Sequence, residues 1–342
     1  MKTIFKTILA SFLLFNLSAQ AQQKVALHHN GVTTIFSNIN PFLDAYSASI
    51  DGDTIYLPGG TFTPPPNFDK RLTIFGAGHY VDSTLTTGKT FINGNVTLKE
   101  NADLFHLEGV EITGHVYLSS NESINGVIIK RCKINGQLNV NGNLSNPSNN
   151  LSIIGNVIIQ RINLENAQTA LLSNNIIVNT FQGSEGNLIT NNIILGYIYG
   201  SSYDYLFFGN NNTLNNNIII WEGYNADVNG YGNIFNNNIY VEPTPSYGVT
   251  PTATGNYTGI LQADIFVNQT GTAFNYSFNY HLQNPGTFLG TDGSEVGIYG
   301  GMFPYKEGAV PQNPHIQTKN IAPQTDNNGD LNIQLKVGAQ TN

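Results

Sequence analysis

The chain has 342 residues, with 14 Lys and Arg against 22 Asp and Glu, and a net charge of −8 at pH 7. So few cations argue against nucleic acid as a partner, because phosphate backbones are bound by clusters of Lys and Arg. The single cysteine excludes an intramolecular disulfide. After the first residues, no stretch reaches the ~18 apolar residues that a membrane span needs.

Residues 1–21 have the pattern of a secretory signal peptide. Lys2 and Lys6 precede an apolar run over residues 8–17, and Ala19 and Ala21 supply the small residues of a cleavage box. We therefore expect an exported protein that is secreted, periplasmic or held at the cell surface.

A short helix is predicted near residues 38–50. Asn40 precedes Pro41, which suits the first position of a helix, and the apolar residues that follow are spaced as on one helical face. We expect this helix to cap the domain that follows it.

One short phrase recurs between residues 151 and 241: an apolar residue, a polar pair that is usually Asn-Asn, and two or three apolar residues, many of them β-branched. Residues 109–114 and 131–136 fall into the same frame, and from Ile112 to Ile239 the six gaps span 127 residues, about 21 each. This period indicates a solenoid, and the short β-branched phrases indicate strands. The sequence thus predicts an all-β, single-stranded parallel β-helix. The recurring positions are Ile112, Ile134, Val157, Ile176, Ile193, Ile218 and Ile239.

The polar pair is expected to form the turn between two strands of each coil. Asn tolerates a positive φ better than other non-glycine residues, so the second Asn is predicted to adopt that conformation. The first Asn is predicted to point inward, where amides from successive coils hydrogen-bond as a ladder. Cys132 is placed in this inward column and is expected to behave as a small buried apolar residue.

The apolar triplets after the pair require that one outer face be covered. Strand alternation cannot send all three residues inward, so at least one apolar column points out. Two covers are open: the strand predicted at residues 331–337, or a second copy of the protein, which would make an oligomer through this face.

The domain is expected to occupy residues 22–310, followed by a tail over 311–342 with that short strand. In the turn before the strand, the spacing of Asp326 and Asp330 resembles a calcium loop, but Asp, Asn and Gly make such turns without an ion. We predict no metal site and no cofactor, and we keep calcium as an alternative only at this turn.

Two ends of the domain resemble a known family. Residues 52–62 (GDTIYLPGGTF) and 72–78 (LTIFGAG) follow the predicted helix, and Tyr280-His281-Leu282 precedes the glycine-rich residues 290–301. These phrases resemble bacterial right-handed parallel β-helix proteins of the pectate-lyase-like superfamily, over residues 35–305. The resemblance implies a right-handed helix. It does not select an activity, because that superfamily includes lyases, hydrolases, epimerases and adhesins.

One charged cluster fits a catalytic site on adjacent coils. Glu108 is expected one coil below Lys130 and Glu111 one coil below Lys133, with Arg131 beside them. A β-helix lyase needs such a Lys or Arg as a base. The alternative is a pair of inter-coil ion bridges that contribute at most ~1 kcal/mol each where exposed.

Aromatic residues gather around one repeat, with amide and carboxylate side chains between them. Flat rings on a rigid scaffold suit the faces of sugars, and an insertion between Ile193 and Ile218 is expected to form a loop on a binding face. The predicted ligand-binding residues are Tyr197, Tyr199, Tyr203, Asp204, Tyr205, Trp221 and Tyr224.

Three functions follow from these patterns. The first is glycan binding or adhesion, with a polysaccharide or a cell-surface glycan as the partner and no clear catalytic residues. The second is a polysaccharide lyase or a related uronate-acting enzyme that uses Lys130, Arg131 and Lys133. The third is a structural spacer.

Overall fold

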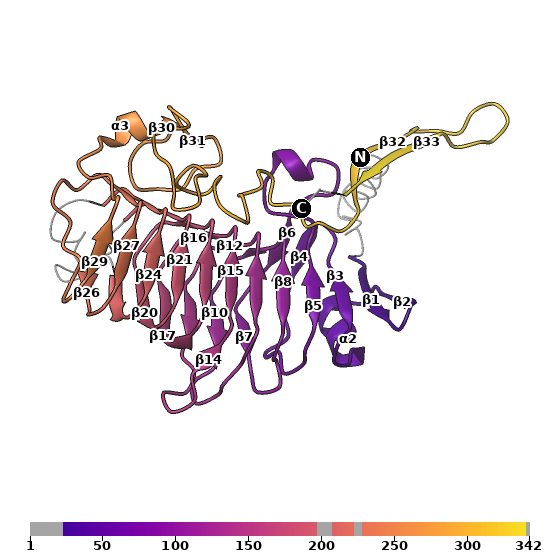
Figure 1. Cartoon of the computed structure of the whole chain (residues 1–342). Coiled ribbons are helices and arrows are strands. Elements are labelled where there is room, and N and C mark those ends of the chain that lie inside the picture. Colours follow the sequence, from indigo (N-terminus) through magenta and orange to yellow (C-terminus); the bar gives the residue numbers. More distant parts are fainter. Residues whose placement is uncertain (1–22, 197–206, 222–227, 340–342) are drawn as a thin grey trace, which may run out of the picture.

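The computed structural model describes residues 23–196, 207–221 and 228–339. The chain winds into a right-handed parallel β-helix of about nine turns, with ~21 residues per turn (Figure 1). The predicted fold class is therefore confirmed. In the central coils each turn contributes one strand to each of three sheets, which we call sheets A, B and C in the order in which the chain visits them.

Within sheets A, B and C of the described residues, named strands pair parallel between coils, except that β1 pairs antiparallel with β2 and with β3. Sheet A consists of β2 (Val32–Phe36), β1 (Val25–His29), β3 (Thr54–Tyr56), β5 (Thr73–Phe75), β8 (His106–Glu108), β11 (Ile128–Lys130), β15 (Ser152–Ile154), β18 (Leu171–Ser173), β21 (Leu188–Thr190), β24 (Thr213–Asn215), β27 (Ile234–Asn236) and β29 (Thr252–Thr254). Sheet B consists of β4 (Gly60–Phe62), β6 (Thr90–Ile92), β9 (Glu111–Ile112), β12 (Lys133–Ile134), β16 (Val157–Ile158), β19 (Ile176–Ile177), β22 (Ile193–Ile194), β25 (Ile218–Ile219) and β28 (Ile239–Tyr240). Sheet C consists of β7 (Val96–Leu98), β10 (Val116–Leu118), β13 (Leu138–Val140), β17 (Ile162–Gln168), β20 (Phe181–Glu185), β23 (Phe207–Asn210) and β26 (Val228–Asn229), with β14 (Ser148–Asn149) beside β17.

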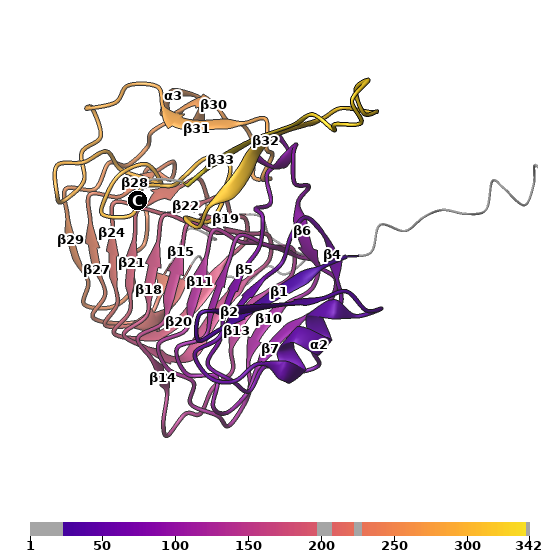
Figure 2. The same ribbon diagram turned by 90° about the vertical axis from the view of Figure 1, so that its right-hand side faces the viewer.

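The predicted capping helix is α2 (Pro41–Ala48). Asn40 caps it by accepting a hydrogen bond from the N–H of Leu43, and Pro41 occupies its first turn. The helix buries Phe42 and Ala45 against the first coils, so the apolar end of the core does not meet solvent. Figure 2 shows α2 at the indigo, N-terminal end of the solenoid.

The repeat frame is one residue earlier in two coils than the sequence pattern predicted. Val157 pairs with Lys133, and Lys133 pairs with Glu111. Ile112 and Ile134, which we expected to share a column with Val157, instead share an inward column with Ile158.

The turn from sheet A to sheet B, which we call the corner, is made by the polar pair, but the two Asn residues have the opposite roles from those predicted. The first residue of each pair has the positive φ, between 51° and 75°. Where this residue is not glycine, its side chain points outward. These residues are Gly109, Arg131, Gly155, Asn174, Asn191, Asn216 and Asn237.

The second residue of each pair points inward and forms the ladder. The backbone N–H of Asn192 donates to Oδ1 of Asn217 in the next coil (2.9 Å), and the same contact joins each successive pair. The ladder amides, all buried or half-buried, are Asn156, Asn175, Asn192, Asn217, Asn238 and Asn256. Cys132 stands at the start of this column and donates its N–H to Asn156. Burial raises the pKa of its thiol to about 12, which fits the predicted apolar role.

The predicted outer apolar column exists and is covered, but not by the C-terminal strand. Residues such as Ile176 and Ile218 pack beneath a segment that contains α3 (Gln262–Ile265), β30 (Phe266–Asn268) and β31 (Asn279–Leu282). Both covers proposed from sequence are thus replaced by residues 260–305. The buried members of this second core are Val157, Ile176, Val178, Ile193, Leu195, Ile218, Ile220, Ile239, Val241, Ile265, Phe266, Tyr280, Leu282, Val296, Ile298 and Tyr305.

Residues 289–310, which we call the strap, run back along the corner toward the N-terminal coils (Figure 1). The outward Asn of each pair holds them. Asn237 donates to the carbonyl of Leu289 (2.9 Å), and Asn174 donates to two strap carbonyls. At the far end, Arg131 donates to the carbonyl of Val310. The Asn-Asn phrase therefore has two uses: one amide builds the core, and the other docks the strap.

The tail forms a hairpin of β32 (His315–Ile321) and β33 (Ile333–Gly338) that projects from the solenoid in Figures 1 and 2. The strand predicted at 331–337 is therefore present, but nearly all its residues are exposed. A short 3-10 turn, η1 (Asp82–Thr84), lies between β5 and β6. In the part of the chain that the structure describes, no helix is long and apolar enough to cross a membrane.

Candidate functional site

A pocket of about 370 Å³ opens where the strap crosses the coils of β11 and β15. Its walls come from the sheet A side of the corner and from the end of the strap and the residues just after it. The lining residues are Lys130, Arg131, Ile154, Met302, Phe303, Pro304, Lys306 and Gln312.

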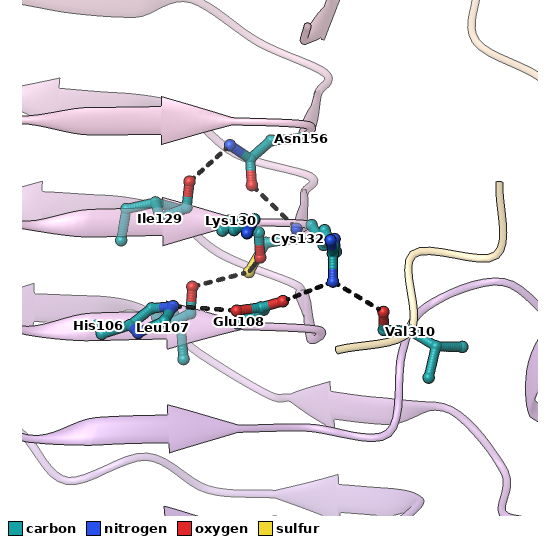
Figure 3. A network of polar contacts seen from close by, with 9 residues as sticks. His106, Leu107, Glu108, Ile129, Lys130, Cys132, Asn156 and Val310 are labelled. Atoms are coloured by element: carbon teal, nitrogen blue, oxygen red, sulfur yellow. Dashed lines mark hydrogen bonds and ion pairs between the residues drawn. The ribbon is translucent and has the colours of Figure 1, made fainter. Parts of the chain in front are cut away.

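A buried ion pair forms the base of this site. The guanidinium of Arg131 donates to Glu108 (3.0 Å), and both side chains are almost fully buried. Arg131 stands at the outward corner position, with a φ of 51°, so its side chain reaches the strap instead of the core. Figure 3 shows Glu108 between His106, whose Nε2 lies 3.0 Å from the carboxylate, and the strap at Val310. The charge of Arg131 is thus balanced inside the protein.

Lys130 is one of two lysines that line the pocket. It is the last residue of β11, pairs with Glu108 in register, and is half-buried. Burial lowers the pKa of Lys130; Glu108 opposes this, and the nearby charges of Arg131 and Lys306 lower it further. Two lysines from elements far apart in sequence therefore face one pocket, next to a carboxylate already neutralised by Arg131. Such a site is complementary to an anionic group.

The outer rim of the pocket is apolar. Met302 is 86% exposed and Phe303 39% exposed, although both are large hydrophobic side chains. An exposed ring and thioether beside two ammonium groups suit a ligand that has an apolar face and an acidic substituent.

The predicted charged trio is divided between two sites. Lys133 lies on sheet B, across the corner from Lys130, and its ammonium pairs with Glu111 (2.9 Å). Lys89 contacts the other oxygen of Glu111 (2.5 Å), and Tyr276 covers both lysines with its ring. Burial raises the pKa of Glu111, but hydrogen bonds from Lys89, Lys133 and Asn135 outweigh it and hold the pKa below its usual value. This cluster contains one of the two predicted ion bridges, Glu111 with Lys133, whereas Glu108 pairs with Arg131 instead of Lys130.

His79 is buried beside this cluster and gives the fold a pH dependence. Its Nδ1 lies 3.2 Å from the hydroxyl of Tyr276, and burial lowers its pKa from 6.5 to about 3. Between these values the unfolded chain binds a proton that the folded chain does not, so stability falls as the pH falls. We expect wild type to lose up to about 1.4 kcal/mol per pH unit relative to His79→Gln. Urea unfolding of both proteins between pH 7 and pH 4 measures this difference; parallel curves would contradict it.

Most of the predicted aromatic site lies outside the described residues. This applies to Tyr197, Tyr199, Tyr203, Asp204, Tyr205 and Tyr224. Trp221 is described and is not an exposed platform: it is 6% exposed and belongs to the main core. The backbone of Gly196 packs against its ring, where a Cβ would come within 2.4 Å of Trp221 Cγ. The prediction of an exposed ring at Trp221 is therefore wrong.

The sequence pattern missed the strap side of the pocket. Lys306, Met302 and Phe303 lie more than 150 residues from Lys130 and follow no repeat, so only the docking of the strap brings them there. Among the described residues, no three His, Cys, Asp or Glu side chains are grouped as metal ligands would be.

Comparison of the chain with protein-family models, with curated proteins and with solved structures found no match.

Proposed function

We propose that the protein binds an acidic polysaccharide through the pocket at the corner, with a sugar carboxylate placed between Lys130 and Lys306. The observation that supports this most is the pairing of two lysines with the exposed side chains of Met302 and Phe303 in one pocket of about 370 Å³. Uronic acids combine a carboxylate with an apolar ring face, and this pocket offers a partner for each.

Export and surface binding belong to the same proposal. The N-terminal signal pattern and the resemblance of residues 35–305 to the pectate-lyase-like superfamily favour a protein that meets polysaccharides outside the cytoplasm. A rigid solenoid that presents a fixed pocket is suited to adhesion, because little ordering of the protein is needed on binding.

Binding without cleavage accounts best for the charges in the pocket. The guanidinium of Arg131 is held by Glu108 and by the strap, so it is not directed at a ligand. Lys133 and Lys89 are likewise paired with Glu111 and lie beneath Tyr276.

A lyase is the second candidate, supported by one observation. Burial and the nearby cations lower the pKa of Lys130, which moves it toward the range in which a lysine can act as a general base. In that case Lys130 would remove the proton from the carbon next to the uronate carboxylate. The bond from the next carbon to the glycosidic oxygen would break, that oxygen would leave with the electron pair and take a proton from water, and the other product would contain an unsaturated sugar.

Titration of the purified protein with acidic and neutral polysaccharides tests the proposal. We expect wild type to bind acidic chains, and Lys130→Ala/Lys306→Ala to bind them at least tenfold more weakly, because each lost charged contact contributes about 1.5–3 kcal/mol. Lys336→Ala, in the projecting hairpin, is the control for a change of net charge and is expected to bind as wild type.

Three results would contradict the proposed binding at this pocket. Equal affinity of the double variant and wild type would place the site elsewhere. Failure of wild type to bind any acidic chain would leave the spacer as the better account. Ultraviolet absorbance of an unsaturated product that depends on Lys130 would favour the lyase.

A further inference from the structure

The hairpin of β32 and β33 has one apolar face and one polar face, because residues paired directly across two strands share a face. The apolar face consists of Ile316, Ile321, Ile333, Leu335 and Val337, with Lys319 opposite Leu335. The polar face includes Thr318, Asn320, Gln334 and Lys336. All five apolar side chains are exposed, by 36% to 58%. A two-stranded hairpin is at best marginally stable in water, so this face needs a partner surface.

The hairpin is held to the solenoid at its base and extends away from it. The hydroxyl of Thr86 donates to the carbonyl of Gln317 at this base (2.9 Å). From there the hairpin reaches past β2, the edge strand at the N-terminal end of sheet A, in the direction of the solenoid axis (Figure 1). Its apolar face is thus presented beyond the coils of its own copy.

The N-terminal end of the solenoid, residues 32–50, also exposes apolar side chains, and we call it the N-terminal cap. The five residues of β2 include no proline and no charged side chain, the features that usually protect an open sheet edge. The edge at the other end, β29, has only three residues and follows Pro251. The exposed apolar residues of the N-terminal cap are Val32, Ile35, Ile39 and Ile50.

We infer that two copies of the protein associate head to head about a two-fold axis, with the apolar face of each hairpin packed on the N-terminal cap of the other copy. Each copy contributes one hairpin and one cap, so the axis covers both surfaces at once and doubles the area that one contact buries. Such a contact is closed and gives dimers, not filaments. It involves neither the pocket nor a sugar, so it is independent of the proposed function.

The charges favour a hairpin packed on the cap over two hairpins packed on each other. Lys319 is the only charged residue among the paired residues of the apolar face. Two hairpins packed face to face about a two-fold axis would bring the two Lys319 side chains toward one another, which is unfavourable. At the cap, Asp44 supplies a carboxylate in the first turn of α2, whereas Lys70 is held by carbonyls at the other end of this helix.

Sedimentation velocity of the purified protein over a range of concentrations, without sugar, tests the inference. We expect wild type to convert from monomer to dimer as its concentration rises. Leu335→Asp places a carboxylate in the apolar face and should raise the Kd of the dimer at least about tenfold. Gln334→Asp adds the same charge to the opposite face of the same strand. This matched control should dimerise as wild type.

A substitution on the cap tests the other half of the contact without altering the hairpin. Ile39→Asp changes a side chain that is fully exposed, so the coils stay intact, and it should weaken the dimer by a similar factor. A mixture of Leu335→Asp and Ile39→Asp should associate more strongly than either variant alone, because the mixed dimer retains one intact hairpin on one intact cap. Hairpins packed on each other would give no such recovery.

Several results would overturn the inference. Wild type that stays monomeric at every concentration is one, and equal weakening by Leu335→Asp and Gln334→Asp is another. A dimer unchanged by Ile39→Asp, or a mixture that associates no better than its components, would show that the hairpin does not pack on the cap. A mass that continues to grow beyond the dimer would show an open contact in place of the closed one.

Discussion

Replacing the ladder residue Asn217 by alanine is expected to destabilise the protein strongly. Its side chain donates to the carbonyl of Ile189 and to Asn238, and accepts from the backbone and side-chain N–H groups of Asn192. All four contacts lie in the buried interior. The substitution leaves several buried polar groups without partners, at about 1–3 kcal/mol each, so we expect a loss of roughly 3–6 kcal/mol.

Equilibrium urea unfolding measures this loss, and the chain supplies a matched control two residues away. Asn215 is half-buried, and the structure gives it one amide partner, Asn236, at 3.2 Å. Asn215→Ala should lower the free energy of unfolding by less than about 1 kcal/mol. Equal losses for the two variants would mean that the ladder adds nothing beyond an ordinary surface amide.

Replacing Glu108 by alanine is expected to cost about 3–5 kcal/mol, because it leaves the buried guanidinium of Arg131 without its carboxylate. The double variant Glu108→Leu/Arg131→Met should recover most of that loss, since a buried ion pair replaced by apolar side chains of similar size is often neutral for stability.

The ion pair of Lys99 and Glu122 is the control for this effect. Its side chains are partly exposed, at 40% and 22%, and its atoms are 3.5 Å apart. Glu122→Ala should therefore cost no more than about 1 kcal/mol in the same urea titration. A loss for Glu108→Ala as small as that for Glu122→Ala would show that the pair is not buried as described.

The repeat period and the recurring phrase around the polar pair predicted the β-helix, because both depend on local residue types. The predicted roles of the two Asn residues were the reverse of the observed ones, because two identical side chains do not indicate which of them has the positive φ. One corner without Asn indicates the true assignment: in Arg131-Cys132 only the cysteine can be buried without a partner, so the first position must point outward. Aligning Cys132 with the second Asn would also have corrected the repeat frame.

The need for a cover could be predicted, but its identity could not. Alternation within Ile218-Ile219-Ile220 requires an apolar column outside, whereas the docking of residues 260–305 depends on contacts far apart in sequence. One local signal was present. Gly297 has a φ of 90°, and a Cβ there would lie 2.5 Å from the Ile218 side chain, so the glycine-rich strap marks a close approach of backbone to the coils.

Only the coil side of the candidate site could be predicted, because contacts between adjacent coils follow from sequence spacing and contacts with the strap do not. Stacking of adjacent coils placed Lys130 over Glu108 from spacing alone, as the register confirms. The partner of Glu108 is Arg131, because the corner turns that side chain outward, and Lys306 arrives only with the strap. Trp221 was misjudged because the residue after the apolar triplet turns back into the core.

A crystal structure of the full protein with a bound uronic acid oligomer tests the central claim most directly. Our account predicts the carboxylate of one sugar within hydrogen-bond distance of Nζ of both Lys130 and Lys306. A sugar bound on the outer face of sheet C, or a carboxylate held away from both lysines, would contradict it.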